Sequence, residues 1–571
     1  MQPNRRTSLE LTLPGVQPGT STNLPDIADA VPWRTWDAAR EEARRRKLPI
    51  LAFAEPRWAN SAQRVALRVQ QDVELRDLVT NRVVPVLVNR DERPDLVATW
   101  RSVAIAQTGT AGPPLIMFLT HEGLPILSYS TMNVEADDTF PSLASLISSL
   151  AESYESNAAD IVAESRELSA DNATSSNENH LTPGWGPLRE RLDFRRGGIQ
   201  ETPKHTHPML LWSLLDIQAA GDLPQDLAAW LRTTLDAMIR GGIWDQIDRG
   251  FHRCTRDELW AVPHFEKPIP LNAQLASVYA RAAAQLEVDT YGEIASQLIS
   301  FCTAALREDV DVISSDTGYY TWTSKEILDT LDPTLVQVVT LHHDLKPVHH
   351  RQALRRVVEM EDMTRFSHES LDVLRTRLAR GRAELRMARL RRPAPRAITV
   401  SALSWRAETV RWLLKAGTWS DGVDVTATAA ILERLVGDRL DTATGYARGT
   451  NYTSAPAYWL EDQAALLAAF VEANKAGCGE RWAMMARQLA DILLASWWTN
   501  SGWSDYLGTT VPSRANIDDL LPSTLGTLAE GFGELGALTG EPRFVECAVA
   551  TTEMRRSLAR GSDHWFADLP H

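Results

Sequence analysis

The feature that most constrains this chain is a long succession of amphipathic helical segments that begins near residue 187 and continues almost to the C-terminus. Segments such as LNAQLASVYARAAAQL and EDQAALLAAFVEAN carry apolar residues three and four positions apart, which is the spacing of one helix face. No strand-like alternation interrupts the series. Paired helices over this length predict either an α-solenoid or a closed α/α toroid, and the uneven segment lengths favour the toroid.

The first part of the chain has a different pattern, in which short apolar runs alternate with helical stretches. PILAFA and VVPVLVN have the pattern of buried strands, and PPLIMFLTHEG followed by LPILSYS predicts a hairpin. Strand, helix, strand, helix and hairpin is the order of a small α/β domain. We therefore expect a loose leader over residues 1–29, the α/β domain over 30–165, a polar linker over 166–186 and the helical domain over 187–571.

Composition excludes several classes of protein. The net charge of −15 argues against a broad surface for nucleic acid or anionic membrane. The chain contains no run of about 18 uncharged apolar residues, so no membrane span is expected. The cysteines form no CxxC pair and fit reduced thiols better than a disulfide framework, which favours a cytoplasmic protein. They are Cys254, Cys302, Cys478 and Cys547.

Several ordered motifs resemble those of one protein family. The strongest match is GGIWDQIDRGFHRCTRDELWAVPHFEK at residues 241–267. Further matches are RDERPD at 90–95, Gly197-Gly198 with Thr202-Pro203-Lys204, Leu460-Glu461-Asp462, and Pro522-Ser523. Together they are similar to the motifs of the spermatogenesis-associated protein 20 family. The resemblance implies an α/β thioredoxin-like domain followed by a mainly α (α/α)6 toroid, a six-hairpin barrel of the epimerase and glycosidase kind.

The chain departs from this family at the redox loop. The family's Cys-His-Trp-Cys falls here on Asn60, Ser61, Ala62 and Gln63, and no cysteine occurs before Cys254. Thiol–disulfide exchange requires a thiolate, so a disulfide oxidoreductase is excluded. We expect the loop to cap the helix that follows it. A second interpretation is that the groove beside Pro114 binds an extended peptide through backbone hydrogen bonds.

The segment around residues 252–267 supplies each side-chain type that a sugar epimerase or isomerase needs: proton carriers, oxyanion partners and orienting carboxylates. The candidate catalytic residues are His252, His264 and Glu266. The candidate substrate-binding residues are Arg253, Asp257, Trp260, Lys267, Asn272, Glu461 and Asp462. The alternative is that these groups pair with neighbouring charges and brace the toroid. Bracing is favoured because polar residues that the resemblance places near the barrel mouth are replaced, as at Ile398-Thr399-Val400.

Other signals are weaker. Tryptophan stacks on sugars but also fills helical cores, and those near the motifs are Trp244, Trp260, Trp405, Trp459 and Trp503. Paired histidines, among them His205 with His207 and His342 with His343, lack zinc spacing and are interpreted as surface residues. No metal or other cofactor is therefore expected. The sequence predicts a redox-inactive protein that binds a carbohydrate or a protein partner, or alternatively an epimerase-like or glycan-processing enzyme.

Overall fold

The computed structural model describes most of the chain. The described residues are 33–54, 56, 58–59, 68–108, 115–129, 142–174, 185–315, 317–343, 350–400, 402–441, 445–446, 458–509, 511–518 and 520–560. The leader predicted over residues 1–29 lies outside them. None of the helices in these ranges is long and apolar enough to cross a membrane.

The first domain is built on a four-stranded sheet. Its strands are β1 (Ile50–Ala54), β2 (Val84–Val88), β3 (Leu115–Leu119) and β4 (Pro125–Tyr129), in the order β2-β1-β3-β4. β1 pairs parallel with β2 and antiparallel with β3, which pairs antiparallel with β4. The strands and the hairpin predicted from the sequence are present.

Helices cover both faces of this sheet because its strands are apolar on both sides. The covering helices are α1 (Trp36–Arg46), α3 (Val73–Asn81), α4 (Pro94–Thr108) and α5 (Leu143–Thr174). Ile50 of β1 faces the core shared with α1 and α4, and the next residue, Leu51, faces the core shared with α3 and α5. The helix α5 continues through residue 165, where we expected this domain to end.

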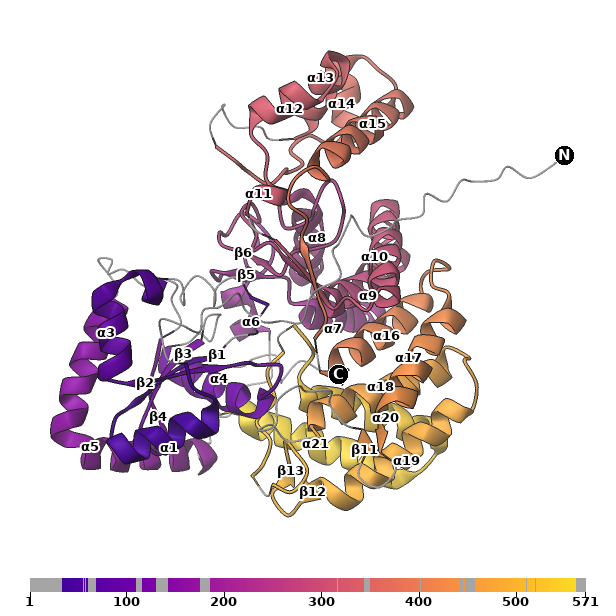
Figure 1. Cartoon of the computed structure of the whole chain (residues 1–571). Helices are drawn as coiled ribbons and strands as arrows, with labels where there is room; N and C mark the ends of the chain where they lie inside the picture. Colours follow the sequence, from indigo (N-terminus) through magenta and orange to yellow (C-terminus); the bar gives the residue numbers. More distant parts are fainter. Residues whose placement is uncertain are drawn as a thin grey trace.

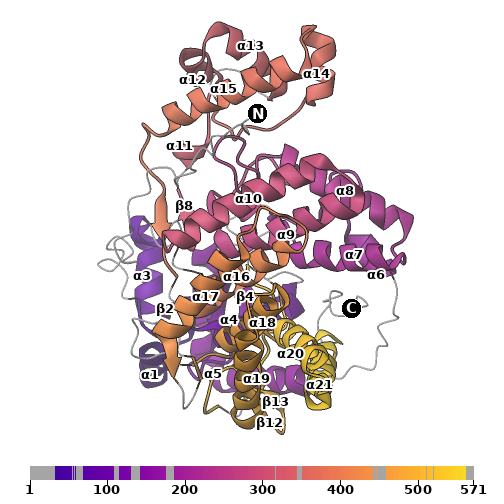
Figure 2. The same ribbon diagram turned by 90° about the vertical axis from the view of Figure 1, so that its right-hand side faces the viewer.

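The rest of the chain forms helical hairpins arranged along a curve, which we call the ring (Figures 1 and 2). The inner helices are α7 (Pro208–Ala220), α9 (Ile269–Leu286), α16 (Leu403–Gly417), α18 (Leu460–Lys475) and α20 (Thr524–Thr539). The outer helices are α8 (Gln225–Arg240), α10 (Asp289–Arg307), α17 (Val425–Arg439), α19 (Arg481–Ser496) and α21 (Pro542–Arg560). The inner helices pack against one another in chain order. Gln274 of α9 donates a 2.9 Å hydrogen bond to the carbonyl of Leu520, which brings the segment before α20 back beside an early helix.

The inner helices α16 and α18 run in the same direction along the lumen of this ring. At their N-terminal ends, the Ser404 N–H donates to Asp462 over 2.8 Å. At their C-terminal ends, Lys415 lies 3.9 Å from Glu472. We call the two ends of the lumen the N-terminal mouth and the C-terminal mouth.

A helical insertion projects from the ring, at the top of Figure 1. It lies between the paired strands β8 (Val312–Ser314) and β9 (Arg396–Ile398), and β8 also pairs with β7 (Glu266–Pro268). Its helices are α11 (Thr317–Tyr320), α12 (Ser324–Thr330), α13 (Pro333–His342), α14 (Met360–Ser367) and α15 (Leu371–Arg389), and they enclose a separate apolar core. The remaining elements are α6 (Gly186–Arg191), β5 (Lys204–His205) with β6 (Cys254–Thr255), β10 (Leu440–Asp441) with β11 (Gly445–Tyr446), and β12 (Trp498–Thr499) with β13 (Gly502–Trp503).

Candidate functional site

The segment predicted to carry the chemistry of the barrel begins just before β6 and ends just before α9, and its charged side chains pair with neighbouring groups. Arg253 and Glu266 form a buried ion pair of 2.9 Å, and the Arg253 N–H donates to the Glu266 carbonyl over 2.8 Å. Lys267 lies 2.7 Å from Asp245, and both are buried. His264 is buried in the same segment. These contacts support the bracing interpretation of the charged residues.

Three of the predicted substrate-binding residues hydrogen-bond to the chain itself. The Asp257 carboxylate accepts from three backbone N–H groups of its own loop over 2.6–3.1 Å. The Trp260 indole donates to a backbone carbonyl 3.1 Å away. The Asn272 side chain bonds to both the N–H and the carbonyl of Phe251, over 2.7 and 3.0 Å. These side chains therefore fix the loop and the start of α9.

His252 differs from the other predicted residues because its ring lies among aromatic groups. The ring centroids of Phe265 and Tyr320 are 5.3 and 4.8 Å away, and the His252 side chain is buried. Within the described part of the chain, its Nδ1 atom has no hydrogen-bond partner. Burial and the positive charge of Lys267 hold the pKa of His252 well below its ordinary value. The imidazole is therefore neutral at physiological pH.

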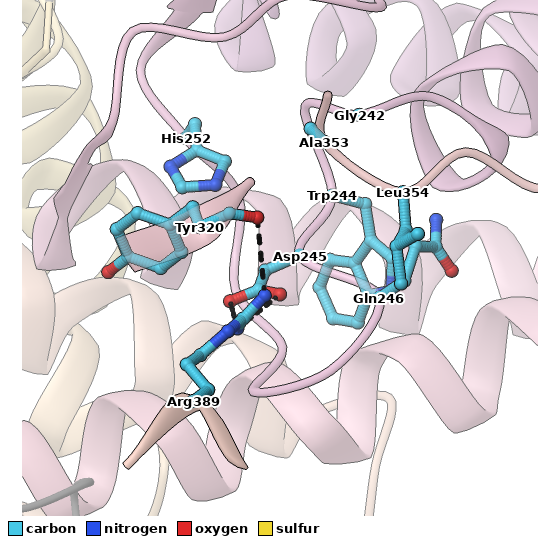
Figure 3. Close-up of a pocket in the computed structure, with 9 residues that line it drawn as sticks. All are labelled: Gly242, Trp244, Asp245, Gln246, His252, Tyr320, Ala353, Leu354 and Arg389. Carbon is cyan, nitrogen blue, oxygen red and sulfur yellow. Dashed lines mark hydrogen bonds and ion pairs between the residues drawn. The ribbon is translucent and has the colours of Figure 1, made fainter. Parts of the chain in front are cut away.

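A small cavity borders His252 (Figure 3). Its volume is about 10 Å³, which gives room for about one water molecule. Arg389 of the insertion lies 2.9 and 2.8 Å from the carboxylate oxygens of Asp245 and 2.9 Å from Asp248. Burial raises the pKa of Asp245, but the charges of Arg389 and Lys267 outweigh this effect and hold that pKa below its ordinary value. Ion pairs between ring and insertion thus border a cavity too small for a sugar.

The predicted residues Glu461 and Asp462 lie at the N-terminal mouth, where the first domain meets the ring. Arg90 of the first domain lies 3.3 Å from Glu461, which also accepts from the Ser404 hydroxyl over 2.8 Å. Asp462 accepts from the Ser404 N–H. Glu461 therefore connects the two domains, and Asp462 fixes the start of a neighbouring inner helix.

The same interface contains Trp58, which precedes the redox loop. The Trp58 indole packs edge to face on Trp405 of α16, with 5.6 Å between ring centroids, and donates to Asp91 over 3.1 Å. Both indoles are buried, as are those of the other tryptophans named from the motifs, so they fill cores. The predicted loop residues Asn60, Ser61, Ala62 and Gln63 and the predicted groove residue Pro114 lie outside the described residues.

Sequence reasoning missed a charged cluster in the lumen, formed by Glu408, Arg411 and Lys415 of α16, Glu472 of α18 and Glu530 of α20. Arg411 and Lys415 both form ion pairs with Glu530. Because α18 lies between α16 and α20, these side chains bridge the lumen. Burial raises the pKa of Glu408, although Arg411 opposes this effect from 3.1 Å away. The signal in the sequence is the spacing of three charged residues along one face of an apolar helix.

The C-terminal mouth brings aromatic and charged groups together. The guanidinium of Arg281, on α9, lies 4.6 Å from the ring of Trp212 and 5.6 Å from that of Trp419. Arg281 also forms a 2.5 Å ion pair with Asp216 of α7. Trp419 is 38% exposed, and Trp212 is half-buried. None of these residues belongs to a family motif, and no spacing in the sequence relates them.

The paired histidines do not all lie on the surface. His342 and His343 are buried in the insertion, where their rings bond to backbone carbonyls over 2.8 and 3.2 Å, so their interpretation as surface residues is wrong. His205 and His207 are half-buried and lie 3.0 and 2.7 Å from the same oxygen of Glu201. Burial lowers the pKa of His205, but its neighbours, among them this carboxylate, outweigh the effect and raise the pKa to about 10.

Known proteins resemble the chain over most of its length. Residues 20–172 match the family model Thioredox_DsbH, described as a protein of unknown function, DUF255. Spermatogenesis-associated protein 20 of Rattus norvegicus is 24% identical over 610 residues, which cover 93% of this chain and 76% of that protein. The Homo sapiens protein of the same name is 24% identical over 93% of this chain and 77% of its own length. The uncharacterized protein B0495.5 of Caenorhabditis elegans is 21% identical over 72% of this chain and 63% of its own length.

Two solved structures of epimerases align with the chain at low similarity. The cellobiose 2-epimerase from Bacillus thermoamylovorans B4167 aligns with a TM-score of 0.40 and 9% identity, over 68% of this chain and 86% of that chain. A sugar epimerase from a ruminal bacterium aligns with a TM-score of 0.39 and 10% identity, over 64% of this chain and 82% of that chain. The predicted fold class, a thioredoxin-like α/β domain followed by a mainly α toroid of paired helices, is confirmed. The similarity along nearly the whole length agrees with the motif resemblance to the spermatogenesis-associated protein 20 family.

Proposed function

We propose that this protein is a redox-inactive thioredoxin-like protein whose toroid binds a carbohydrate. The observation that carries the redox part is that no cysteine occurs in the first 253 residues, so the thioredoxin-like domain has no thiol to offer. Thiol–disulfide exchange requires a thiolate as the attacking group. Amide and hydroxyl side chains at the position of the family's cysteines do not replace it.

The thiols of the ring do not compensate for this loss. Cys254, Cys302 and Cys547 are buried, and all four cysteines are free. Burial raises the pKa of Cys302 well above its ordinary value and that of Cys547 to about 12. Burial also raises the pKa of the partly exposed Cys478. Thiols with raised pKa values form little thiolate at pH 7, which makes them slow nucleophiles.

The carbohydrate part of the proposal rests on the C-terminal mouth. Sugars are recognised by aromatic faces that stack on C–H groups, together with charged side chains that hydrogen-bond to hydroxyls. Trp419 and Trp212 supply the aromatic faces, and Arg281 and Asp216 supply a charged donor and a charged acceptor within the same few ångströms. The N-terminal mouth is, by contrast, occupied by the contact between Trp58 and Trp405.

Calorimetric titration with neutral mono- and disaccharides, among them glucose, mannose, N-acetylglucosamine and cellobiose, tests this assignment. We expect one of these sugars to bind with a stoichiometry of one, and Trp419→Ala to weaken binding at least about 10-fold, a loss typical of one stacking contact. The matched control is Trp498→Ala, which changes a partly buried tryptophan of the β12–β13 hairpin. Equal affinity of both variants and the wild type would place the ligand elsewhere. Reduction of insulin by the purified chain would refute redox inactivity.

The second candidate function is a sugar epimerase or isomerase, and His252 is the observation that favours it. A neutral, buried imidazole with an unpaired Nδ1 is a suitable proton acceptor. Substrate access would require the ion pairs between Arg389 and the ring to open, because the cavity beside His252 holds about one water molecule. The test is incubation of the same sugars with the protein in D2O. Deuterium incorporated beside the sugar carbonyl, and lost in His252→Asn or His264→Ala, would establish this function in place of simple binding.

A further inference from the structure

A cluster of metal-ligating side chains lies where β5 leads into α7. It consists of Glu201, His205 and His207, whose ligand atoms all lie within 4.8 Å of one another. The carboxylate Oε1 of Glu201 is 3.0 Å from Nδ1 of His205 and 2.7 Å from Nε2 of His207. The three side chains are between 25% and 31% exposed, so the cluster is open to ions from solution.

The spacing of these atoms suits a single small cation. Zinc binds imidazole nitrogen and carboxylate oxygen at about 2.0–2.2 Å, which sets neighbouring ligands of a tetrahedral site roughly 3.3 Å apart. The two observed distances from the Glu201 oxygen are slightly shorter than this, so small side-chain movements suffice to admit an ion. Two histidines and one glutamate leave a fourth position for water, as in other zinc sites with three protein ligands.

The backbone around the cluster is held in place independently of any ion. Lys204, next to His205, is completely buried; its Nζ donates to Asp193 and to the Glu258 carbonyl, both over 3.1 Å. The same ammonium lies 5.1 Å from the ring of Trp260. The His205 N–H donates to Glu201 over 3.0 Å. A metal site built on such a fixed segment loses little conformational freedom when the ion binds.

A cysteine, another residue type that can bind metals, lies next to the cluster on the strand β6. Cys254 pairs with His205 across the two short strands β5 and β6, and its thiol is buried. The strand register places Cys254 directly opposite His205. A partner on the far side of a ligating histidine fixes the orientation of the ring and its tautomer. Cys254 is not one of the three residues whose ligand atoms converge, so it belongs to this supporting role.

We propose that Glu201, His205 and His207 bind one zinc ion, with water as the fourth ligand and Cys254 as a positioning residue behind His205. The competing arrangement is a carboxylate that only pairs with two imidazoles and takes up no metal. The two arrangements differ in their response to added zinc.

The test uses the full chain, stripped with a chelator and titrated with ZnCl2 at pH 7.5 by calorimetry and by thermal unfolding. We expect one zinc ion per chain and a melting temperature that rises with zinc concentration, since the ion binds the folded state. His207→Ala and Glu201→Gln should each weaken zinc binding at least about 100-fold. Loss of a residue that only supports a metal ligand already weakens metal binding by up to about 100-fold, and loss of the ligand itself should weaken it at least as much. The matched control is His350→Ala, an exposed histidine outside the cluster, which should bind zinc as the wild type does.

Cobalt substitution separates the roles of the residues. Co²⁺ in the proposed site should give visible bands of a tetrahedral nitrogen and oxygen environment, without the intense near-ultraviolet band of a cobalt–thiolate bond. That band, if present and lost in Cys254→Ser, would overturn the assignment of Cys254. Circular dichroism establishes that each variant is folded. Zinc uptake that is absent, or unchanged in the double variant His205→Asn/His207→Asn, would overturn the site itself. These results are independent of sugar binding at the C-terminal mouth.

Discussion

The indole of Trp58 meets the indole of Trp405 edge to face, with 5.6 Å between the ring centroids. One ring comes from the segment before the redox loop and the other from an inner helix of the toroid. Trp58 belongs to the same continuous apolar core as the ring helices. The thioredoxin-like domain therefore shares part of the apolar core of the toroid, and we expect the two to unfold together.

Truncation at this contact tests the shared core. Trp58→Ala should lower the free energy of unfolding by about 3–5 kcal/mol, the usual cost of removing a large buried aromatic side chain. In a double-mutant cycle with Trp405→Ala, the coupling energy should be about 0.5–1.5 kcal/mol, as for aromatic pairs in contact. Denaturant unfolding at equilibrium measures both. Trp100→Ala is the control: it removes an equally buried indole of the first domain and should show no coupling to Trp405. Coupling as large for Trp100 as for Trp58 would contradict a direct contact.

The ion pair between Arg253 and Glu266 should stabilise the folded segment that leads into α9. Glu266→Gln leaves a buried guanidinium without its counter-charge, so we expect a loss of about 3–5 kcal/mol in unfolding free energy. Glu258→Gln removes an exposed partner of Arg196 and should change stability by less than about 1 kcal/mol. If Glu266→Gln unfolds like the wild type but no longer turns over or binds a sugar, the carboxylate acts on the ligand and the bracing interpretation is wrong.

Asp505, which lies beside the interface between the domains, should make stability depend on pH. Burial raises its pKa to about 7, and the charges of Asp95 and Glu461 act in the same direction. The unfolded chain releases this proton near pH 4 and the folded chain near pH 7, so the folded state binds more protons between these values. Stability from this group is therefore present below about pH 4 and falls as pH rises towards 7.

Replacing this carboxyl group tests the sign of the effect. Asp505→Asn should be more stable than the wild type at pH 8 by about 1–3 kcal/mol and equally stable near pH 4, because the residue is partly exposed and solvent screens part of the shift. Urea unfolding across this pH range provides the measurement. The exposed Asp289→Asn should keep the wild-type slope. A variant that gains stability only at low pH would reverse the assignment.

Thiol reactivity should follow burial. In the native protein, Cys478 is partly exposed and the other three cysteines are buried, so one thiol per chain should react with a disulfide dye within minutes at pH 8. Unfolding in guanidinium should release all four. Cys478→Ser should remove the fast phase of the reaction with the dye and leave the slow reaction of the three buried thiols unchanged. Several fast thiols in the native wild type would contradict the packing around Cys302 and Cys547.

Sequence reasoning succeeded where a pattern is local. The strands of the first domain and the helices of the ring follow from apolar periodicity. It did not show that Glu461 pairs with Arg90, because the two residues are 371 positions apart and each also suits a helix terminus or a turn. The lumen cluster and the pairing of His205 with Glu201 were missed for the same reason: their partners come together only through helix packing and loop geometry.

The ion pairs from Arg411 and Lys415 to Glu530 have a consequence for how the toroid is used. They join helices that are not neighbours, so they act as a crossbar through the middle of the ring. A molecule could not pass between these helices without breaking the ion pairs. Because the contact between Trp58 and Trp405 occupies the N-terminal mouth, a molecule bound at the C-terminal mouth would enter and leave on that side.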